Sequence, residues 1–307
     1  LGSFEAHYMD YQANFFKQCG QSRFSMLADN VKQPFNEYLG LLLNFGIIGL
    51  LVLLLLMVII IYCYRKNPSV EKQIAFYSLS SIGIFSFFSY PFAYPFVWVV
   101  TFLSIFIITS EYIKPLFSNI LIKKIACMFI LTYSLFGSSK LFERIQAELD
   151  WGKASTLALC KSYNETLPTY ERLEKMFVSN PYFLYNYAAV LQEMKQYTES
   201  LEVALKCRQY WADYDLELII GENYQQLNKP ELAEKYYNSA SMMCPSRFLP
   251  LYKLFHLYKT NGEKERSLAM AEAVISKPMK IKTTTIRMMK REMEREIQKM
   301  NMSIKLE

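Results

Sequence analysis

A group of polar residues directly precedes the most apolar run of this 307-residue chain. Asn36 and Glu37 stand immediately before that run, and Arg23 and Lys32 come a little earlier. A carboxylate that is partly desolvated beside a bilayer can have a raised pKa, so Glu37 is a candidate general base. Cations stabilise the charge that develops on a phosphate or pyrophosphate leaving group. Lys32 and Arg23, together with Asn36, are therefore candidate substrate-binding residues.

The same residue types also have a plain structural interpretation. Asn36 could cap a helix, Glu37 could interact with the positive end of its dipole, and Lys32 could face lipid phosphate. His7, which is flanked by aromatic residues, is a second candidate base or else a packed loop histidine. The sequence leaves both interpretations open.

The apolar run predicts a transmembrane helix at residues 40–64. No charged residue occurs in it, and Asn44 is its one strongly polar side chain. A helix needs about 20 apolar residues to cross a bilayer. The Leu, Ile, Val and Phe side chains of the run favour insertion by roughly 7 kcal/mol in total, more than one Asn can reverse.

Further membrane helices are expected after this one. The stretch from Ile74 to Ser110 has no charge and is too long for one helix, and the sequence Tyr90-Pro91-Phe92-Ala93-Tyr94-Pro95 interrupts it. Proline removes a helical N–H and disfavours helix at the residue before it. The predicted additional spans lie at about 72–89, 95–110 and 119–139.

The charges of the short loops predict the orientation. The loops 65–72 and 111–124 carry Lys and Arg, whereas the 90–95 loop carries no charge. Basic loops stay in the cytoplasm. The predicted domains are a periplasmic loop segment at 1–39, membrane helices at 40–139 and a periplasmic repeat domain at 140–307.

The C-terminal half contains a repeat of about 34 residues over 181–279. Small residues recur at one position in three successive units, and the middle unit fits the tetratricopeptide pattern of small and aromatic residues. These positions are Ser200, Ala233 and Ser267 for the small residues, and Gly221, Tyr224, Ala233, Tyr237, Ala240 and Pro245 for the middle unit. A degenerate unit at 142–178 is expected to lead the array, and an amphipathic helix at 283–303 to cap it. The fold class is therefore all-α, with about four transmembrane helices followed by a tetratricopeptide-type solenoid.

Composition argues against several other functions. The net charge of +6 forms no basic stripe with interleaved aromatics, so nucleic acid is not an expected partner. The six cysteines are scattered without a CxxC pair, and there are two histidines, so neither a metal site nor a redox motif is expected. Transport through the proline break is disfavoured because the stretch from Ile74 to Ser110 around it carries no charge.

Several motifs resemble the O-antigen ligase and O-antigen polymerase superfamily. Phe35-Asn36-Glu37-Tyr38-Leu39 and the later Asn44-Phe45-Gly46-Ile47-Ile48-Gly49 resemble its "HN-x-YL … E-x-G-x-x-G" signature. Leu1-Gly2-Ser3-Phe4 resembles the end of its "G-x-G-S/T-F" element, and Ser89-Tyr90-Pro91-Phe92 with the repeat tail resembles a branch with fused C-terminal repeats.

The resemblance implies a glycosyltransferase in the bacterial inner membrane. Such an enzyme moves a glycan from an undecaprenyl pyrophosphate carrier to an acceptor hydroxyl on lipid A core, a protein or another glycan, without a cofactor. The family's histidine aligns with Phe35, so Glu37 or His7 would have to serve as catalytic base, and the family's glutamate aligns with Asn44. The chain begins without Met, so it is expected to be the C-terminal part of a longer protein and inactive alone. The alternative is a non-enzymatic membrane-anchored repeat scaffold that binds a protein partner.

Overall fold

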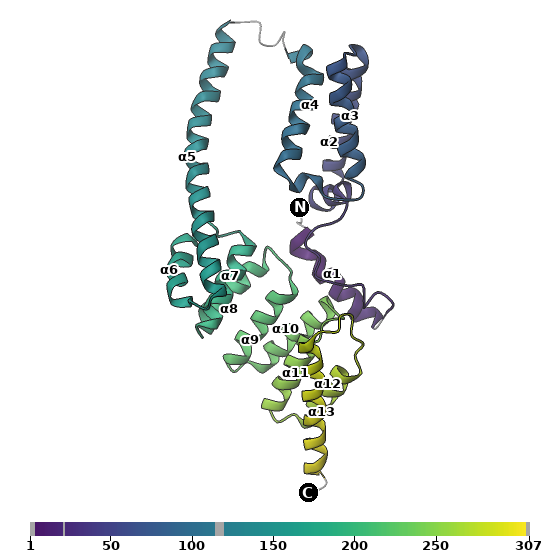
Figure 1. Ribbon diagram of the computed structural model, residues 1–307, viewed down its shortest axis with the longest axis vertical. Coiled ribbons are helices and arrows are strands. Elements are labelled where there is room, and N and C mark those ends of the chain that lie inside the picture. The colour runs from purple at the N-terminus through teal and green to yellow at the C-terminus, as the bar shows by residue number, and fades with distance from the viewer. Residues whose placement is uncertain (1–3, 21, 114–119, 305–307) are drawn as a thin grey trace. The chain divides into compact units, whose positions relative to one another are not determined.

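The computed structural model describes residues 4–20, 22–113 and 120–304, and the regular elements in these ranges are all helices (Figure 1). Their contacts divide the chain into two compact units. The first, called the apolar unit below, contains Lys32–Leu149 and Phe4. The second, called the repeat unit, contains Glu5–Val31 and Asp150–Glu307.

The apolar unit contains three long helices and the first part of a fourth. In it, α3 packs against α4, and α2 contacts both. Gly46 lies inside α2 with φ 65° and ψ −165°, a conformation that glycine adopts at little cost, and the helix is kinked there. The elements are α2 (Glu37–Lys66), α3 (Val70–Phe85), the 3-10 helix η1 (Pro91–Ala93), α4 (Pro95–Ile113) and α5 (Ile120–Leu159).

Two of the described helices are long and apolar enough to cross a membrane, namely α2 and the Pro95–Tyr112 part of α4. No residue in the most apolar window of α2 is buried inside the protein. A helix that is apolar on every face and exposed is expected to face lipid. The prediction of about four spans is therefore not confirmed, and the two helices named here are the ones with the required length and composition.

The other two predicted spans have different boundaries in the structure. The one at 72–89 corresponds to α3, which has 16 residues. The one at 119–139 corresponds to the first half of α5, apart from residue 119, which lies outside the described residues. Since α5 continues to Leu159, the predicted domain boundary at 139/140 falls inside one helix.

The repeat unit consists of antiparallel helix pairs, and each pair contacts the next. The pairs are α7 with α8, α9 with α10 and α11 with α12, and the end of α5 with α6 precedes them. The bounds are α6 (Tyr163–Leu173), α7 (Pro181–Glu193), α8 (Tyr197–Arg208), α9 (Tyr214–Gln226), α10 (Pro230–Met243), α11 (Leu249–Thr260), α12 (Lys264–Ser276) and α13 (Thr284–Ile304).

The turn inside each pair shows the period of the repeat. Lys161, Lys195, Asn228 and Gly262 have positive φ angles and follow one another at intervals of 34, 33 and 34 residues. A single left-handed residue after the last turn is a common way to end a helix. The predicted period is confirmed, and the turn at Lys161 marks the predicted degenerate first unit.

The small residues found in the sequence are where the paired helices touch. Ser200, Ala233 and Ser267 are each 0% exposed. A Cβ atom added to Gly221 would lie 2.6 Å from Cε1 of Tyr237, so only glycine lets α9 approach α10 this closely. These contacts give a tetratricopeptide-like array.

The amphipathic C-terminal helix caps the array as predicted. Met293 of α13 is fully buried in a cluster with Phe248 and Phe255. The hydroxyl of Tyr252 donates to Oε2 of Glu292 at 2.9 Å. The polar face of α13 remains available to solvent, which suits a terminal element.

Candidate functional site

The N-terminal residues 5–31, called the docked segment below, pack along the repeat array. Most of α1 (Phe4–Cys19) belongs to this segment (Figure 1). Met9 is fully buried in an apolar cluster of the repeat unit that includes Tyr214, Tyr237 and Leu254. The array thus buries a side chain that comes from a distant part of the sequence.

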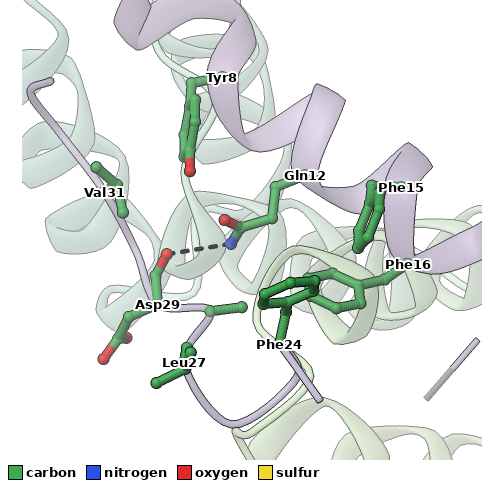
Figure 2. Close-up of a pocket in the computed structure, with 9 residues that line it drawn as sticks. Tyr8, Gln12, Phe15, Phe16, Phe24, Leu27, Asp29 and Val31 are labelled. Carbon is green, nitrogen blue, oxygen red and sulfur yellow. Dashed lines mark hydrogen bonds between the residues drawn. The ribbon is translucent and has the colours of Figure 1, made fainter. Parts of the chain in front are cut away.

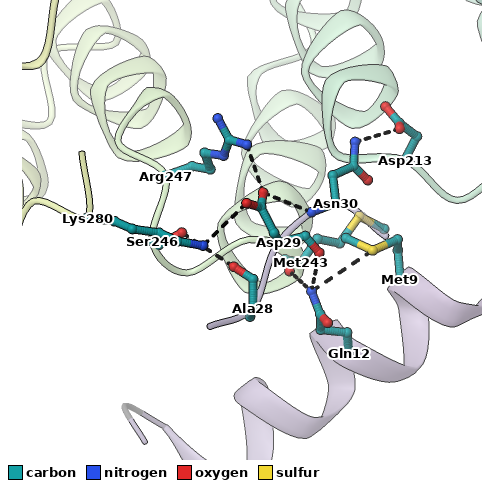
Figure 3. A network of polar contacts seen from close by, with 10 residues as sticks. All are labelled: Met9, Gln12, Ala28, Asp29, Asn30, Asp213, Met243, Ser246, Arg247 and Lys280. Atoms are coloured by element: carbon teal, nitrogen blue, oxygen red, sulfur yellow. Dashed lines mark hydrogen bonds and ion pairs between the residues drawn. The ribbon is translucent and has the colours of Figure 1, made fainter. Parts of the chain in front are cut away.

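Hydrogen bonds fasten the docked segment to the connections between successive helix pairs (Figure 3). Nε2 of Gln12 donates to the carbonyl oxygen of Met243 at 2.6 Å and to that of Asp29 at 3.1 Å. Nδ2 of Asn30 donates to Oδ2 of Asp213 at 2.7 Å. Since Asp213 and Met243 stand where one helix pair ends and the next begins, the segment follows the edge at which the repeats join.

Ion pairs add to this attachment at two places. Asp29 pairs with Arg247 at 2.7 Å and with Lys280 at 3.3 Å. Burial by itself would raise the pKa of Asp29, but hydrogen bonds from Arg247, the Asn30 backbone and Lys280 outweigh it and lower the pKa from 3.8. Asp29 therefore stays ionised, with cations from two inter-repeat connections around it.

The second ion-pair cluster includes a buried acid. Arg208 at the end of α8 pairs both with Asp10 of the docked segment and with Glu217 of α9. Burial raises the pKa of Glu217, and the neighbouring Arg208 opposes that rise. Arg208 is thus the counter-ion of a nearly inaccessible carboxylate and one attachment point of the segment.

The candidate residues at the start of α2 have structural contacts. The Oδ1 atom of Asn36 accepts the N–H of Leu39 at 2.9 Å, as an N-cap does, and its Nδ2 donates to the Phe87 carbonyl at 3.0 Å. The Oε1 atom of Glu37 accepts the N–H of Phe92 at 3.0 Å. Asn36 is thus the N-cap that the structural interpretation of the sequence allowed, whereas the contacts of both residues with the 87–92 connection were not predicted.

The remaining candidates are spread over both units. His7 is exposed on α1, and the Arg23 guanidinium lies 4.8 Å from the centre of the Phe24 ring. Both belong to the repeat unit, whereas Lys32 is an exposed residue of the apolar unit. Catalysis by Glu37 or His7 stays a prediction. Among the described residues there is no group of three His, Cys, Asp or Glu side chains that could hold a metal ion.

Sequence reasoning missed the residues that attach the docked segment, because it treated 1–39 as one loop. A signal was present: Ala6, Met9, Ala13 and Phe16 follow helical spacing, with no Gly or Pro among them. These four side chains are buried or partly buried in the repeat unit. The arrangement as a whole offers apolar burial and fixed ion pairs to the segment that it holds.

Comparison with known proteins identifies no family for this chain. No family model matches it, and no curated protein matches it. Its repeats are similar to those of solved tetratricopeptide repeat (TPR) structures.

One of these is the crystal structure of YrrB, "a TPR protein with an unusual peptide-binding site". It is 19% identical over 42% of this chain and 66% of that chain, just under two thirds, with a TM-score of 0.38. A crystal structure of MamA is 13% identical over 50% of this chain and 89% of that one, with a TM-score of 0.40. A fragment of MamA from Desulfovibrio magneticus RS-1 is 20% identical over 48% of this chain and 76% of that one, with a TM-score of 0.38.

The predicted membership of the O-antigen ligase and polymerase superfamily is wrong. No family model matches the chain, and the similar solved structures are repeat proteins. The lipid-linked glycan partners inferred from that resemblance lose their support with it. The short motif that carried the resemblance contains Asn36 and Glu37, whose contacts fasten a helix start.

Proposed function

We propose that this protein is a membrane-anchored scaffold whose repeat array binds other proteins. The observation that carries the proposal is the docked segment itself. The array takes up a helix and the irregular residues that follow it by burying Met9 and by pairing Asp10 and Asp29 with its own arginines. Burial of an apolar side chain combined with charge pairs at the rim is how helical arrays recognise peptides.

The first helix of each pair offers the surface for a partner. Tyr185 on α7 is partly exposed and Asp215 on α9 is exposed, and the buried residues of the same helices hold the array rigid. Gln192, Asn223 and Ser200 form a continuous hydrogen-bonded chain between neighbouring pairs, with distances of 3.1 and 2.8 Å. A rigid array lowers the entropy cost of binding.

The apolar unit supplies the anchor. Leu51 and Leu55 on α2 are 57% and 59% exposed, an arrangement that water would not tolerate along a helix of 30 residues. About 20 apolar residues suffice to span a bilayer, and α2 exceeds that length. The apolar exposure is therefore accounted for when the helix lies in lipid.

Contacts within the apolar unit support three passes. The N–H of Glu37 at the start of α2 donates to the Ser86 carbonyl just after α3 at 2.9 Å, so α3 ends where α2 begins. Lys72 at the start of α3 pairs with Glu111 near the end of α4 at 3.0 Å, so α4 runs back again. The 16 residues of α3 rise about 24 Å, and modest bilayer thinning accommodates that mismatch.

Contacts within the repeat unit support a fourth pass. The docked segment and the array touch each other, so both are on one side of the membrane and the chain between them crosses it an even number of times. After three passes, the first half of α5 is the helix that can return. Arg65, Lys66 and Lys72 lie at the opposite end of these helices, so the positive-inside rule puts the array outside the cytoplasm.

An extraction experiment tests the anchor. The full chain should remain with membranes through an alkaline carbonate wash. Leu51→Arg and Leu55→Arg on α2, combined with Phe102→Arg and Phe106→Arg on α4, should release it, because each arginine near the bilayer centre costs about 3 kcal/mol. Leu159→Arg is the matched control, since Leu159 is exposed but lies outside the apolar helices. Wild-type protein in the soluble fraction would refute the anchor.

Site-specific cross-linking tests the scaffold. A photoreactive residue at Tyr185 or Asp215 in the full chain should yield one recurrent protein adduct in cells. The same residue at Glu231, which is exposed on α10, should not yield that adduct. Identical adduct patterns at all three positions would contradict a specific binding face.

A further inference from the structure

The docked segment exposes apolar side chains on its outer side. Tyr11, Phe15, Phe24 and Leu27, called the aromatic face below, are 73%, 41%, 44% and 74% exposed. Phe15, Phe24 and Leu27 surround one open, mostly apolar pocket of about 330 Å³, shown in Figure 2. Tyr11 lies one helical turn before Phe15, so it shares the same side of α1.

The acidic residues of the docked segment contact the array, and its basic residues are exposed. Its three acidic residues all contact the array: Glu5 accepts from the Tyr182 hydroxyl at 3.3 Å, Asp10 pairs with Arg208, and Asp29 pairs with Arg247. Lys17 and Arg23 are exposed, and neither pairs with a carboxylate among the described residues. Arg23 lies beside the aromatic face, with its guanidinium 4.8 Å from the centre of the Phe24 ring. Lys17 follows Asp10 by two helical turns, so it lies on the flank of α1 between the array and the aromatic face.

The chain itself limits how far this face can be from a bilayer. Residues 32–36 are all that separate Val31 from the first residue of α2. A fully extended link of that length reaches roughly 20 Å. This step rests on the proposed function, because it requires that α2 be in the membrane.

We propose that the aromatic face docks on an anionic phospholipid surface. Exposed aromatic and leucine side chains beside lysine and arginine are the composition of segments that lie at the headgroup level of a bilayer. Lys17 and Arg23 contact lipid phosphates, and the aromatic side chains enter the boundary below them. The acidic residues cannot oppose this attraction, because the array neutralises them.

A depth measurement on the full chain in nanodiscs tests this docking. Exposed cysteines Cys19, Cys127 and Cys160 are changed to Ser, and a single spin label is placed by Leu27→Cys, with Gln226→Cys as an aqueous control and Leu54→Cys as the membrane reference. Collision rates with oxygen and with a water-soluble nickel chelate are compared in phosphatidylcholine discs with and without phosphatidylglycerol. The label at 27 should become oxygen-accessible and nickel-shielded in the anionic discs, while the label at 226 stays nickel-accessible.

Removing the two cations sharpens the test. Lys17→Gln with Arg23→Gln should reduce the docked-to-free ratio about 30-fold in anionic discs, or about fivefold per cation. Lys175→Gln with Lys229→Gln removes two exposed lysines of the array and should leave the ratio unchanged. High salt should act like the first pair of substitutions, because it screens surface attraction.

The outcomes separate this inference from the proposed function. A label at Leu54 outside lipid would refute the membrane anchor, and the docking with it. A label at Leu54 in lipid with an aqueous label at 27 in both disc types would refute the docking alone. A label at 27 shielded from both reagents in both disc types would mean that a protein, or a second copy of this chain, covers the aromatic face, and would also overturn the proposal.

Discussion

The two units use the same apolar residue types in opposite ways. On α2 of the apolar unit, Leu51 and Leu55 are more than half exposed, whereas Leu216 on α9 of the repeat unit is 0% exposed. The repeat unit hides its apolar side chains between paired helices, and the apolar unit presents them outward. The hydrophobicity of a single residue therefore does not predict what it will contact. The distribution of apolar residues around the whole helix does predict it.

The strongest test of this contrast is the same truncation made in both units. Leu216→Ala should destabilise the array by about 3–5 kcal/mol, because it leaves a cavity in a closed core. Leu55→Ala removes a side chain without a protein cavity and should change insertion by less than about 1 kcal/mol. Hydrogen exchange of the α9 and α10 amides in the full chain measures the difference, and equal effects from the two variants would abolish the contrast.

A second test of the contrast compares a buried ion pair of the repeat unit with an exposed ion pair of the apolar unit. Arg208→Met should cost about 3 kcal/mol, because it strands the buried Glu217 without its counter-ion. Lys140→Met removes an exposed partner of Glu143 and should cost under about 1 kcal/mol. Denaturant unfolding of the full chain reports both variants, and the docked segment should also become protease-sensitive in Arg208→Met. Full protection of that segment would mean that Asp10 contributes nothing to its attachment.

A smaller effect is expected at the start of α2. Glu37→Ala should raise hydrogen exchange at Phe92 by the equivalent of about 1–2 kcal/mol, because that N–H loses its acceptor. Glu37→Gln keeps an oxygen in the same place and should stay near the wild type. If neither variant changes exchange, the carboxylate does not hold this connection and a chemical role for Glu37 gains weight.

The smallest effect concerns the cap of the array. Burial lowers the pKa of His256 from 6.5, with the nearby Glu292 opposing the shift. The unfolded state then binds more protons as pH falls below about 6.5, so α13 should be held less tightly at pH 5.5 than at pH 7.5. Exchange of α13 amides measures the change, and His256→Gln should remove its pH dependence. Tighter holding at low pH would reverse the sign and mean that Glu292 dominates.

Local patterns predicted much of the fold. Ser200, Ala233 and Ser267 recur because paired helices need a small residue where they cross, and that requirement is visible in one repeat length of sequence. The α2 helix could also be predicted from local sequence, because a continuous apolar run of more than about 20 residues is typical of a membrane-spanning helix.

The site was not predictable in the same way. The bond from Gln12 to Met243 joins residues 231 positions apart, and neither residue type signals a partner. At 34–39, by contrast, a family-like motif misled because Asn36 and Glu37 are also what a well-capped helix start requires. The same short motif can occur in a catalytic site or at the start of a helix, and the contacts of its side chains in the folded protein show which of the two it is.

The distance along the chain between Asp10 and Arg208 has a consequence for biosynthesis. The two residues are 198 positions apart, so a ribosome adding roughly 5–20 residues per second completes Asp10 some 10–40 s before its partner emerges. During that interval the nascent N-terminal helix keeps its apolar stripe uncovered. A translation product that stopped before α9 would lack the residues that bury Met9, and would present that stripe to chaperones and proteases.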